Sequence, residues 1–374
     1  MTVAAFMDLA LYHPHLGYYT RAPRRSGRAG DFFTSVDVGP LYGELLADEL
    51  AEMADLVART VEPPLESAAS WSARSAEAPA FDLVEAGAGD GRLAADILRR
   101  LRASHPTVYE RTRLHLVEAS AAARRAQPAT LGEVADRLTS SGDSLPDQFA
   151  GVLLANELID AMPVHQVVMR EDGLREVYVV SDCRTLITRE GPPSTPALAA
   201  LLDRLRVELE PGWRAEINLR AIGWIREALR RLETGFMVLV DYGHAATELY
   251  SAAHAGGTLT TFSQHLAEGA EAKPGSARWL QRPGEQDITS HVDFTSLRAE
   301  VELAGADVLA FLDQTYFLMG LASARAKTLD QRQRLALKTL VMPGGLGSTM
   351  KVLIAGKGMG NPSLSCCSFR VRAT

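Results

Sequence analysis

The chain has 374 residues, enough for two or more domains at roughly 150 residues each, and 47% of them are hydrophobic and 23% are charged. This is the composition of an ordinary globular protein and excludes a disordered or fibrous chain. With 39 Lys and Arg against 46 Asp and Glu, the net charge is −7, which argues against a general nucleic-acid-binding surface.

The first 80 residues are predicted to form an N-terminal helical segment. Residues 2–12 fit one or two helical turns, which Pro14 brings to an end because the residue before a proline is pushed out of the helical region. Apolar residues then recur at helical spacing over residues 38–57, which predicts an amphipathic helix. Residues 61–80 are rich in Pro, Ala, Ser and Glu and are predicted to form a surface loop.

From residue 81 onward, short apolar runs alternate with helical stretches, which predicts an α/β core with a mostly parallel sheet. This core is predicted to comprise residues 81–160 and 216–356, with an inserted β-hairpin and helical subdomain at 161–215 and a mobile tail at 357–374. The predicted strands are 81–84, 114–117, 152–154, 236–240, 308–312 and 351–354, and the predicted helices are 92–101, 219–232 and 294–303.

Cysteine content and hydropathy suggest where the protein works. Three cysteines are too few for a disulfide framework and lack zinc-ligand spacing, and His13 and His15 have no third ligand nearby, so we expect a reducing compartment and no metal site. No apolar run approaches roughly 18 residues, which argues against membrane insertion. The first basic residue, Arg21, comes late for a signal or transit peptide, so we expect a cytoplasmic protein.

The stretch FDLVEAGAGDGRL at 81–93 is the most informative part of the sequence. A predicted strand ends near Glu85, and three glycines lead into a helix whose first N–H groups are free to bind a ligand. A second acid, Glu118, ends the next predicted strand, where a carboxylate can accept hydrogen bonds from ribose hydroxyls. This arrangement indicates a nucleoside-binding site and differs from the GxGxxG fingerprint of dinucleotide sites.

The chain resembles the MidA family of S-adenosylmethionine (SAM)-dependent methyltransferases. The resemblance rests on blocks found in order along most of the chain: ALYHPHLGYY at 10–19, GDFFTS at 30–35, YGELL at 42–46, VEAGAGDGRLAADILR at 84–99, HLVEAS at 115–120, ANELIDAMPVHQ at 155–166, VDYGH at 240–244, GTL at 257–259 and DITSHVDF at 287–294. It implies a Rossmann-like methyltransferase fold, SAM as cofactor and an N-terminal lid over the cofactor cleft. It also implies methylation of an arginine in a protein client, which is a respiratory complex I subunit for the mitochondrial member.

The resemblance and the strand-end positions together predict a set of site residues. The expected cofactor-binding residues are Glu85, Gly87, Ala88, Gly89, Gly91, Glu118, Ala119, Asp31, Phe32 and Thr34. We expect Glu157 and Asp160 to orient the substrate guanidinium and polarise its attacking nitrogen, with Asn156 contacting cofactor or substrate. Asp241, Tyr242 and His265 are expected on the substrate side.

Other interpretations remain open at this point. The family loop usually reads Gly-Pro-Gly-Arg-Gly, whereas this chain has Ala88 and Asp90 inside it, which puts substrate preference more in doubt than cofactor binding. The alternatives are a methyltransferase for small molecules, a SAM-binding assembly factor without catalysis, and a nicotinamide-dependent oxidoreductase. The client, the number of methyl groups transferred and the oligomeric state are left open.

Overall fold

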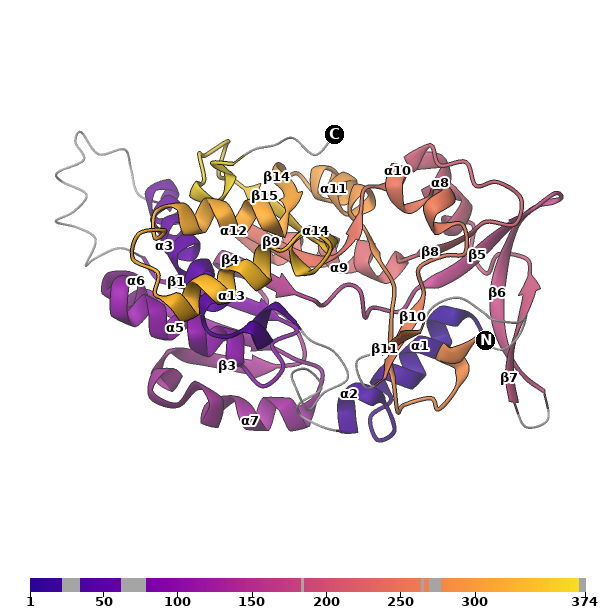
Figure 1. Ribbon diagram of the computed structural model, residues 1–374, viewed down its shortest axis with the longest axis horizontal. Helices are drawn as coiled ribbons and strands as arrows, with labels where there is room; N and C mark the ends of the chain where they lie inside the picture. Colours follow the sequence, from indigo (N-terminus) through magenta and orange to yellow (C-terminus); the bar gives the residue numbers. More distant parts are fainter. Residues whose placement is uncertain (22–33, 62–78, 183–184, 264–265, 269–276, 370–374) are drawn as a thin grey trace. The chain divides into compact units, whose positions relative to one another are not determined.

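The structure is a computed structural model that describes residues 1–21, 34–61, 79–182, 185–263, 266–268 and 277–369 (Figure 1). The chain forms two compact units. Unit 1 comprises residues 1–33, 157–226 and 241–300, and unit 2 comprises residues 34–156, 227–240 and 301–374. Unit 1 therefore contains the expected insertion, residues 161–215, together with residues 1–33 and 241–300.

Unit 2 is built on a mostly parallel sheet with the strand order β14-β15-β9-β4-β1-β2-β3, which confirms the predicted α/β core (Figure 1). Strands β1, β2, β3, β4 and β9 pair in parallel, and β14 pairs antiparallel with β15. The strands are β1 (Phe81–Ala86), β2 (Thr112–Val117), β3 (Leu138–Gly142), β4 (Phe149–Asn156), β9 (Leu232–His244), β14 (Asp307–Asp313) and β15 (Met350–Lys357). The last residues of β9, from Asp241 to His244, belong to unit 1. Because β1 and β4 are buried at nearly every position, they appear in the sequence as continuous apolar runs.

The helices of unit 2 cover this sheet. Helix α3 contacts α5 on one side and α12 and α13 on another, and it also contacts β1 and β4. The helices are α3 (Leu41–Val61), α5 (Arg92–Ser104), α6 (Pro106–Arg111), α7 (Ala121–Leu131), α12 (Gln314–Ser323), α13 (Gln331–Val341) and α14 (Leu346–Thr349), with 3-10 turns η1 (Ser35–Val38), η3 (Gly132–Arg137) and η6 (Ser365–Cys367). Helix α7 begins at Ser120, whose hydroxyl accepts the N–H of Ala123.

Two glycines allow β1, β4 and β9 to approach closely near the start of the sheet. A Cβ on Gly151 would lie 2.1 Å from the carbonyl oxygen of Asp82, and a Cβ on Gly235 would lie 1.9 Å from that of Gly151. Their φ angles of 152° and 132° are also ones that other residues rarely adopt. These glycines therefore fix how the three central strands begin.

Unit 1 contains two antiparallel sheets packed with helices. One sheet has the order β7-β6-β5-β8 and the other β11-β10-β12 (Figure 1). The strands are β5 (His165–Arg170), β6 (Gly173–Asp182), β7 (Thr185–Gly191), β8 (Arg214–Ile217), β10 (Thr260–Ser263), β11 (Leu266–Glu268), β12 (Asp287–Thr289) and β13 (Val292–Asp293). The helices are α1 (Val3–Tyr12), α2 (Tyr18–Arg21), α8 (Ala197–Leu205), α9 (Leu219–Arg231), α10 (Ala246–Leu249) and α11 (Phe294–Leu303), with η4 (Ala252–His254) and η5 (Arg278–Leu280).

The predicted hairpin exists as β5 and β6, but β7 and β8 extend it to a four-stranded sheet. Helix α1 packs its apolar face against this part of unit 1. Phe6 lies with its ring centre 5.6 Å from that of Trp279, and both belong to a core that includes Val177 and Val179 of β6.

The described residues after β15, 358–369, pack against other parts of the protein. Cys366 and Cys367 are buried thiols, and the N–H of Cys366 donates to the Glu49 carboxylate at 3.2 Å. Turn η6 also contacts α12. The expectation of a mobile tail over 357–374 therefore does not describe residues 358–369, and residues 370–374 lie outside the described residues.

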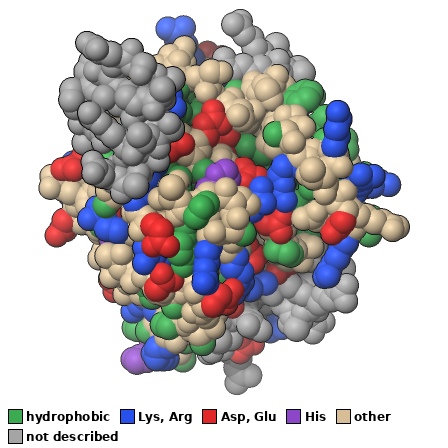
Figure 2. All heavy atoms as spheres, turned by 90° about the vertical axis from the view of Figure 1, so that its left-hand side faces the viewer, with side chains coloured by type: hydrophobic (Ala, Val, Ile, Leu, Met, Phe, Trp, Pro, Cys, Tyr) green, Lys and Arg blue, Asp and Glu red, His purple; other side chains and the backbone are tan. Residues whose placement is uncertain are grey.

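The surface carries charges of both signs, as the nearly balanced charge of the sequence predicts. On the face shown in Figure 2, Lys and Arg side chains are interspersed with Asp and Glu. Within the described ranges, no helix is both long enough and apolar enough to cross a bilayer.

Candidate functional site

The glycine loop lies between β1 and α5, as the sequence predicts. Gly87, Gly89 and Gly91 have φ angles of 75°, 52° and 88°, which lie in the region that favours glycine. A Cβ added at Gly89 would meet no atom within 4 Å, so the tip of the loop faces open space. Gly91 is the N-cap of α5 and brings no side chain to the cap. The N–H of Ala94, in the first turn of α5, donates to the Glu85 carboxylate.

Hydrogen bonds from neighbouring elements hold this loop in place. The N–H of Gly89 donates to Oε2 of Glu118 at 2.9 Å, and the N–H of Ser120 donates to Oε1 of the same carboxylate at 2.7 Å. The Gln127 side chain donates to the carbonyl oxygen of Gly89 at 2.9 Å. Glu118 therefore joins the end of β2 to the tip of the loop, and each of its oxygens keeps a lone pair for another donor.

Glu85, the last residue but one of β1, has a buried carboxyl group, and one oxygen of this group lacks a hydrogen bond. It is 5% exposed, and its Oε2 atom has no hydrogen-bond partner. Burial raises the pKa of Glu85 from its ordinary value of 4.5 to about 8, and the nearby carboxylates of Asp90 and Glu118 add to the shift. The backbone N–H of Ala94 donates to the Glu85 carboxylate and opposes this shift, whereas the buried Oε2 atom has no donor. A buried oxygen without a donor is costly, so this position suits a ligand that brings a cation or a hydrogen-bond donor.

These features fit SAM. Its amino-acid end carries an ammonium group that would satisfy the Glu85 carboxylate, and its ribose carries hydroxyls that can donate to Glu118. The backbone of the glycine loop leaves room for close approach at Gly89. When bound, SAM supplies an electrophilic methyl group, and the residues of the chain bind and orient it.

The other predicted cofactor residues differ in burial, and two of them lie outside the described residues. Ala88 is buried, and its N–H donates to the Val117 carbonyl at 3.1 Å; Ala119 is exposed in the turn after β2. Thr34 is buried and begins η1, where its hydroxyl donates to Asp37 at 2.9 Å. Asp31 and Phe32 lie outside the described residues, so the predicted lid stays a prediction.

Asn156 is the last residue of β4, at the carboxyl edge of the parallel strands. Its side-chain oxygen accepts a hydrogen bond of 2.6 Å from the Tyr42 hydroxyl of α3. The side chain is therefore held in one orientation at the sheet edge where open α/β folds place their ligands.

The predicted acceptor-side residues come together in unit 1 around Asp241. One oxygen of Asp241 accepts the N–H groups of Leu158, Ile159 and Asp160 at 3.2, 2.7 and 3.4 Å, and the other accepts the N–H of Tyr242 at 2.8 Å. Burial raises the pKa of Asp241, and these four N–H groups oppose that shift because they favour the charged form. Asp241 thus fixes the backbone of the 157–160 turn and contributes negative charge beside it.

Glu157 and Asp160 occupy that turn. Glu157 has a φ angle of 51°, an uncommon conformation for a residue with a side chain. Burial raises the pKa of Asp160 well above its ordinary value, and the neighbouring carboxylates of Asp241, Asp287 and Glu157 raise it further. The turn therefore gathers four carboxyl groups, a number that favours a cationic ligand.

Two tyrosines and Asp287 join this cluster. The Tyr19 hydroxyl donates to Oδ1 of Asp287 at 2.8 Å, and the Tyr12 ring stacks on Tyr19 with ring centres 5.5 Å apart. Burial raises the pKa of Tyr242, and the carboxylates of Glu157 and Asp160 add to it, so its hydroxyl stays protonated. Tyr19 and Asp287 were not among the predicted site residues, although they stand in the ALYHPHLGYY and DITSHVDF blocks. His265 lies outside the described residues.

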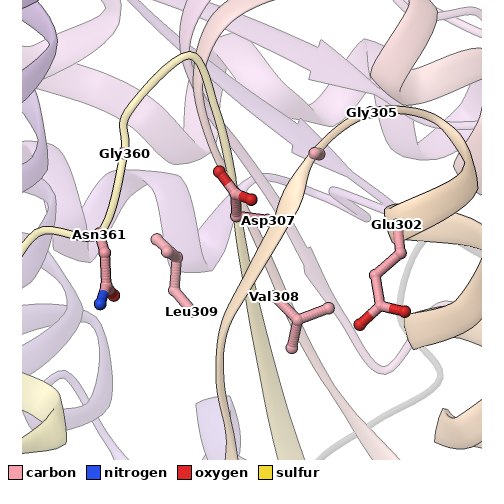
Figure 3. Close-up of a pocket in the computed structure, with 8 residues that line it drawn as sticks. Glu302, Gly305, Asp307, Val308, Leu309, Gly360 and Asn361 are labelled. Carbon is pink, nitrogen blue, oxygen red and sulfur yellow. The ribbon is translucent and has the colours of Figure 1, made fainter.

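Figure 3 shows a separate hollow of about 760 Å³ between the end of α11 and the start of β14. It is lined by Glu302, Gly305, Ala306, Asp307, Val308, Leu309, Gly360 and Asn361. None of the predicted site residues lines it.

Comparison with known proteins identifies the family. Residues 65–312 match a family described as "Putative S-adenosyl-L-methionine-dependent methyltransferase". A crystal structure of a "likely methyl transferase" from Burkholderia thailandensis bound to S-adenosyl-homocysteine is 27% identical, with a TM-score of 0.83 over 100% of this chain and 92% of that one. The fold is thus that of a protein with the demethylated cofactor bound.

Curated relatives agree with this assignment. The mitochondrial protein arginine methyltransferase NDUFAF7 of Mus musculus is 29% identical over 96% of this chain and 77% of its own length. The mitochondrial homologue from Drosophila melanogaster is 27% identical over 81% of this chain and 67% of its own length.

These relatives correct one expectation. Both are mitochondrial proteins, so the expectation of a cytoplasmic location is wrong. That expectation rested on the position of Arg21, and no compartment follows from the first residues of the printed sequence.

Proposed function

The chain belongs to this family of SAM-dependent methyltransferases, and from that premise we propose that its acceptor is an arginine side chain of a protein client. SAM is the methyl donor. The names of the mouse and fruit-fly relatives support arginine as the acceptor. The family resemblance points to a respiratory complex I subunit as the client.

The observation that carries the proposal is the cluster of carboxyl groups and tyrosines in unit 1. Burial and three neighbouring carboxylates raise the pKa of Asp160, so a bound cation would relieve the repulsion that keeps Asp160 protonated. A guanidinium is planar, permanently charged and rich in donors, and it pairs with carboxylates in fork geometry. Tyr12 and Tyr19 stack on each other beside the cluster, and the guanidinium of Arg220 lies over the Tyr12 ring, 5.7 Å from its centre.

In this proposal the residues have distinct roles. Glu157 and Asp160 accept hydrogen bonds from the guanidinium, orient it and draw positive charge away from the attacking nitrogen. As the new N–C bond forms, the bond between the donor sulfur and the methyl carbon breaks and S-adenosylhomocysteine is left. A proton leaves the methylated nitrogen, and the carboxylates are the nearest bases of this cluster. Asp241 positions the turn that carries both residues, because one of its oxygens accepts the backbone N–H groups of 158–160.

The cofactor side is proposed to involve Glu85, Glu118 and the glycine loop, with Ala88, Ala119 and Thr34 bordering it. Asn156, held by Tyr42, is proposed to contact cofactor or substrate. Asp31, Phe32 and His265 remain proposals from the family blocks alone.

The test is a methylation assay with labelled SAM on isolated complex I subunits and on a pool of metabolites. We expect label in a protein fraction and methylarginine by mass spectrometry. Glu157→Gln is expected to lower turnover at least about a hundredfold while S-adenosylhomocysteine affinity stays within about twofold. Label found only in metabolites would replace the proposal with small-molecule methylation, and cofactor binding without any labelled product would indicate a non-catalytic assembly factor.

A further inference from the structure

Three histidines that lie far apart in the sequence come together in unit 1. His244 ends β9, His254 ends η4, and His291 lies between β12 and β13. One nitrogen from each ring can be chosen so that all three lie within 4.8 Å of one another. The Nε2 atom of His244 and the Nδ1 atom of His291 are 3.1 Å apart, and the ring centres of His244 and His254 are 4.8 Å apart.

Glu248, on α10, lies beside two of these rings and holds one of them, His254, by a hydrogen bond. The Nδ1 atom of His254 lies 3.0 Å from the main-chain oxygen of Glu248, and that of His244 lies 3.1 Å from its carboxylate. A carbonyl oxygen only accepts, so His254 carries its proton on Nδ1 and leaves Nε2 with a lone pair. Metal-binding histidines typically place their second nitrogen against a carbonyl or carboxylate in this way, which fixes the ring and raises its basicity as a ligand.

The backbone of the third ligand is also fixed. The N–H of His291 donates to the Thr258 hydroxyl at 3.0 Å, and Val292, the next residue, pairs with Gly243 of β9. His291 and His244 therefore sit on adjacent, hydrogen-bonded segments. All three rings are only partly buried, so an ion from solvent can reach them.

We propose that His244, His254 and His291 form a binding site for Zn²⁺ or a related first-row transition metal. The ligand atoms are Nε2 of His244, Nε2 of His254 and Nδ1 of His291. Zinc–nitrogen bonds of about 2.0–2.1 Å place two ligand nitrogens roughly 3.3 Å apart in a tetrahedral site, close to the 3.1 Å between His244 and His291. An all-imidazole set favours zinc, copper or nickel over Mg²⁺ or Ca²⁺.

The fourth coordination position would be open to water, as in other three-histidine sites. The ion would connect the end of β9, η4 and the β12–β13 turn, three segments of unit 1 that the sequence separates. A hydrogen-bonded group of rings is the competing explanation. It accounts for the contact between His244 and His291, but among the described residues no hydrogen bond reaches Nε2 of His254.

The experiment uses untagged full-length protein stripped of metal by a chelator. Titration with ZnCl₂ by calorimetry is expected to show one equivalent bound, and Co²⁺ is expected to give the visible spectrum of a tetrahedral site that Zn²⁺ abolishes. His254→Ala is expected to weaken Zn²⁺ binding at least tenfold. His15→Ala, at an exposed position of the same unit, is the matched control and should bind like the parent protein.

A replacement ligand separates a lost ligand from a damaged fold. His254→Cys is expected to bind Co²⁺ and to add a thiolate-to-cobalt band in the near ultraviolet that the parent protein lacks. The site is refuted if the parent protein binds no stoichiometric Zn²⁺, if His254→Ala and His291→Ala bind as tightly as it does, or if His254→Cys gives no such band. None of these readouts depends on the proposed methyl acceptor.

Discussion

The backbone N–H of Gly89 donates to Oε2 of Glu118 over 2.9 Å, so the tip of the cofactor loop is held by the acid that follows the neighbouring strand. One carboxylate thus fixes the loop and remains available to a ligand. A hydrogen bond to a charged group contributes about 1.5–3 kcal/mol, and every 1.4 kcal/mol is a tenfold change in affinity.

Glu118→Gln should therefore weaken S-adenosylhomocysteine binding by about 10–100-fold, because an amide nitrogen cannot accept the backbone N–H it would face. Isothermal titration measures this directly. Glu133→Gln is the control, since Glu133 pairs with Arg99 at the surface of the same unit. Equal affinities for the two variants would remove Glu118 from the cofactor site.

Glu85 predicts a pH dependence of stability. In the unfolded chain it ionises near its ordinary pKa of 4.5, whereas in the folded chain it keeps its proton up to about pH 8. Between these values the folded state holds one more proton, so the free energy of unfolding falls as pH rises, by up to roughly 1.4 kcal/mol per pH unit. Glu85→Gln should remove this part of the slope in urea unfolding without cofactor.

Glu49 provides the matched variant, because burial raises its pKa to about 7 in the same unit. Glu49→Gln should flatten the slope only up to that pH and should leave cofactor affinity unchanged. Calorimetry at pH 7 in buffers of different ionisation enthalpy should show close to one proton released from Glu85 on cofactor binding in the parent protein and none in Glu85→Gln. Identical proton counts would mean that Glu85 does not face the bound cofactor.

Asp160→Asn tests the acceptor cluster. The pKa of Asp160 is raised, so the folded chain keeps a proton there that the unfolded chain loses as pH rises above about 3.8. Asn cannot ionise, so the variant does not lose stability in this way as pH rises. At neutral pH it should therefore unfold at an equal or higher urea concentration than the parent protein. The KM for an arginine substrate should nevertheless rise at least about tenfold, because a carboxylate partner is gone.

Asp172→Asn is the control for that measurement, because Asp172 pairs with Arg175 at the surface of the same unit. Surface pairs contribute little, so its stability and KM should change only slightly. An unchanged KM in Asp160→Asn would exclude Asp160 from substrate binding.

Gly151→Ala should destabilise the protein by at least about 3 kcal/mol, because the new methyl group would lie 2.1 Å from the carbonyl oxygen of Asp82 at an unfavourable φ. Gly223→Ala provides the contrast. Gly223 lies in α9 with no atom within 4 Å of its added Cβ, and alanine there should stabilise the helix by up to about 1 kcal/mol. Thermal unfolding of both variants measures the difference, and similar midpoints would contradict the close strand approach.

The cofactor loop could be predicted from the sequence because its parts are neighbours in the chain. Strand β1, three glycines and α5 follow one another, and Glu118 ends the next strand. Strand β3 could not be found in this way, because most of its residues are exposed and it has no apolar run. Helix α12 was missed too, although Phe317, Leu318 and Leu321 are buried in it.

The rest of the candidate site depends on long-range folding. Tyr19 and Asp287 meet through a 2.8 Å hydrogen bond across most of the sequence, and no local spacing indicates that. The histidines of the proposed metal site come from three segments in the same way, so the absence of zinc-ligand spacing carried no information about them. Strand ends and glycine loops show in a sequence, whereas side chains gathered by antiparallel sheets do not.

Unit 1 is assembled from three separate segments of the chain, and this has a consequence for biosynthesis. Helix α1 contacts β5 and β6, and it also contacts β12, which begins at Asp287. Its apolar face, with Phe6, Met7 and Leu11, is therefore fully covered only after all of these segments have been translated. Each unit combines three separate segments of the chain, so neither unit can be expressed as a single uninterrupted gene fragment.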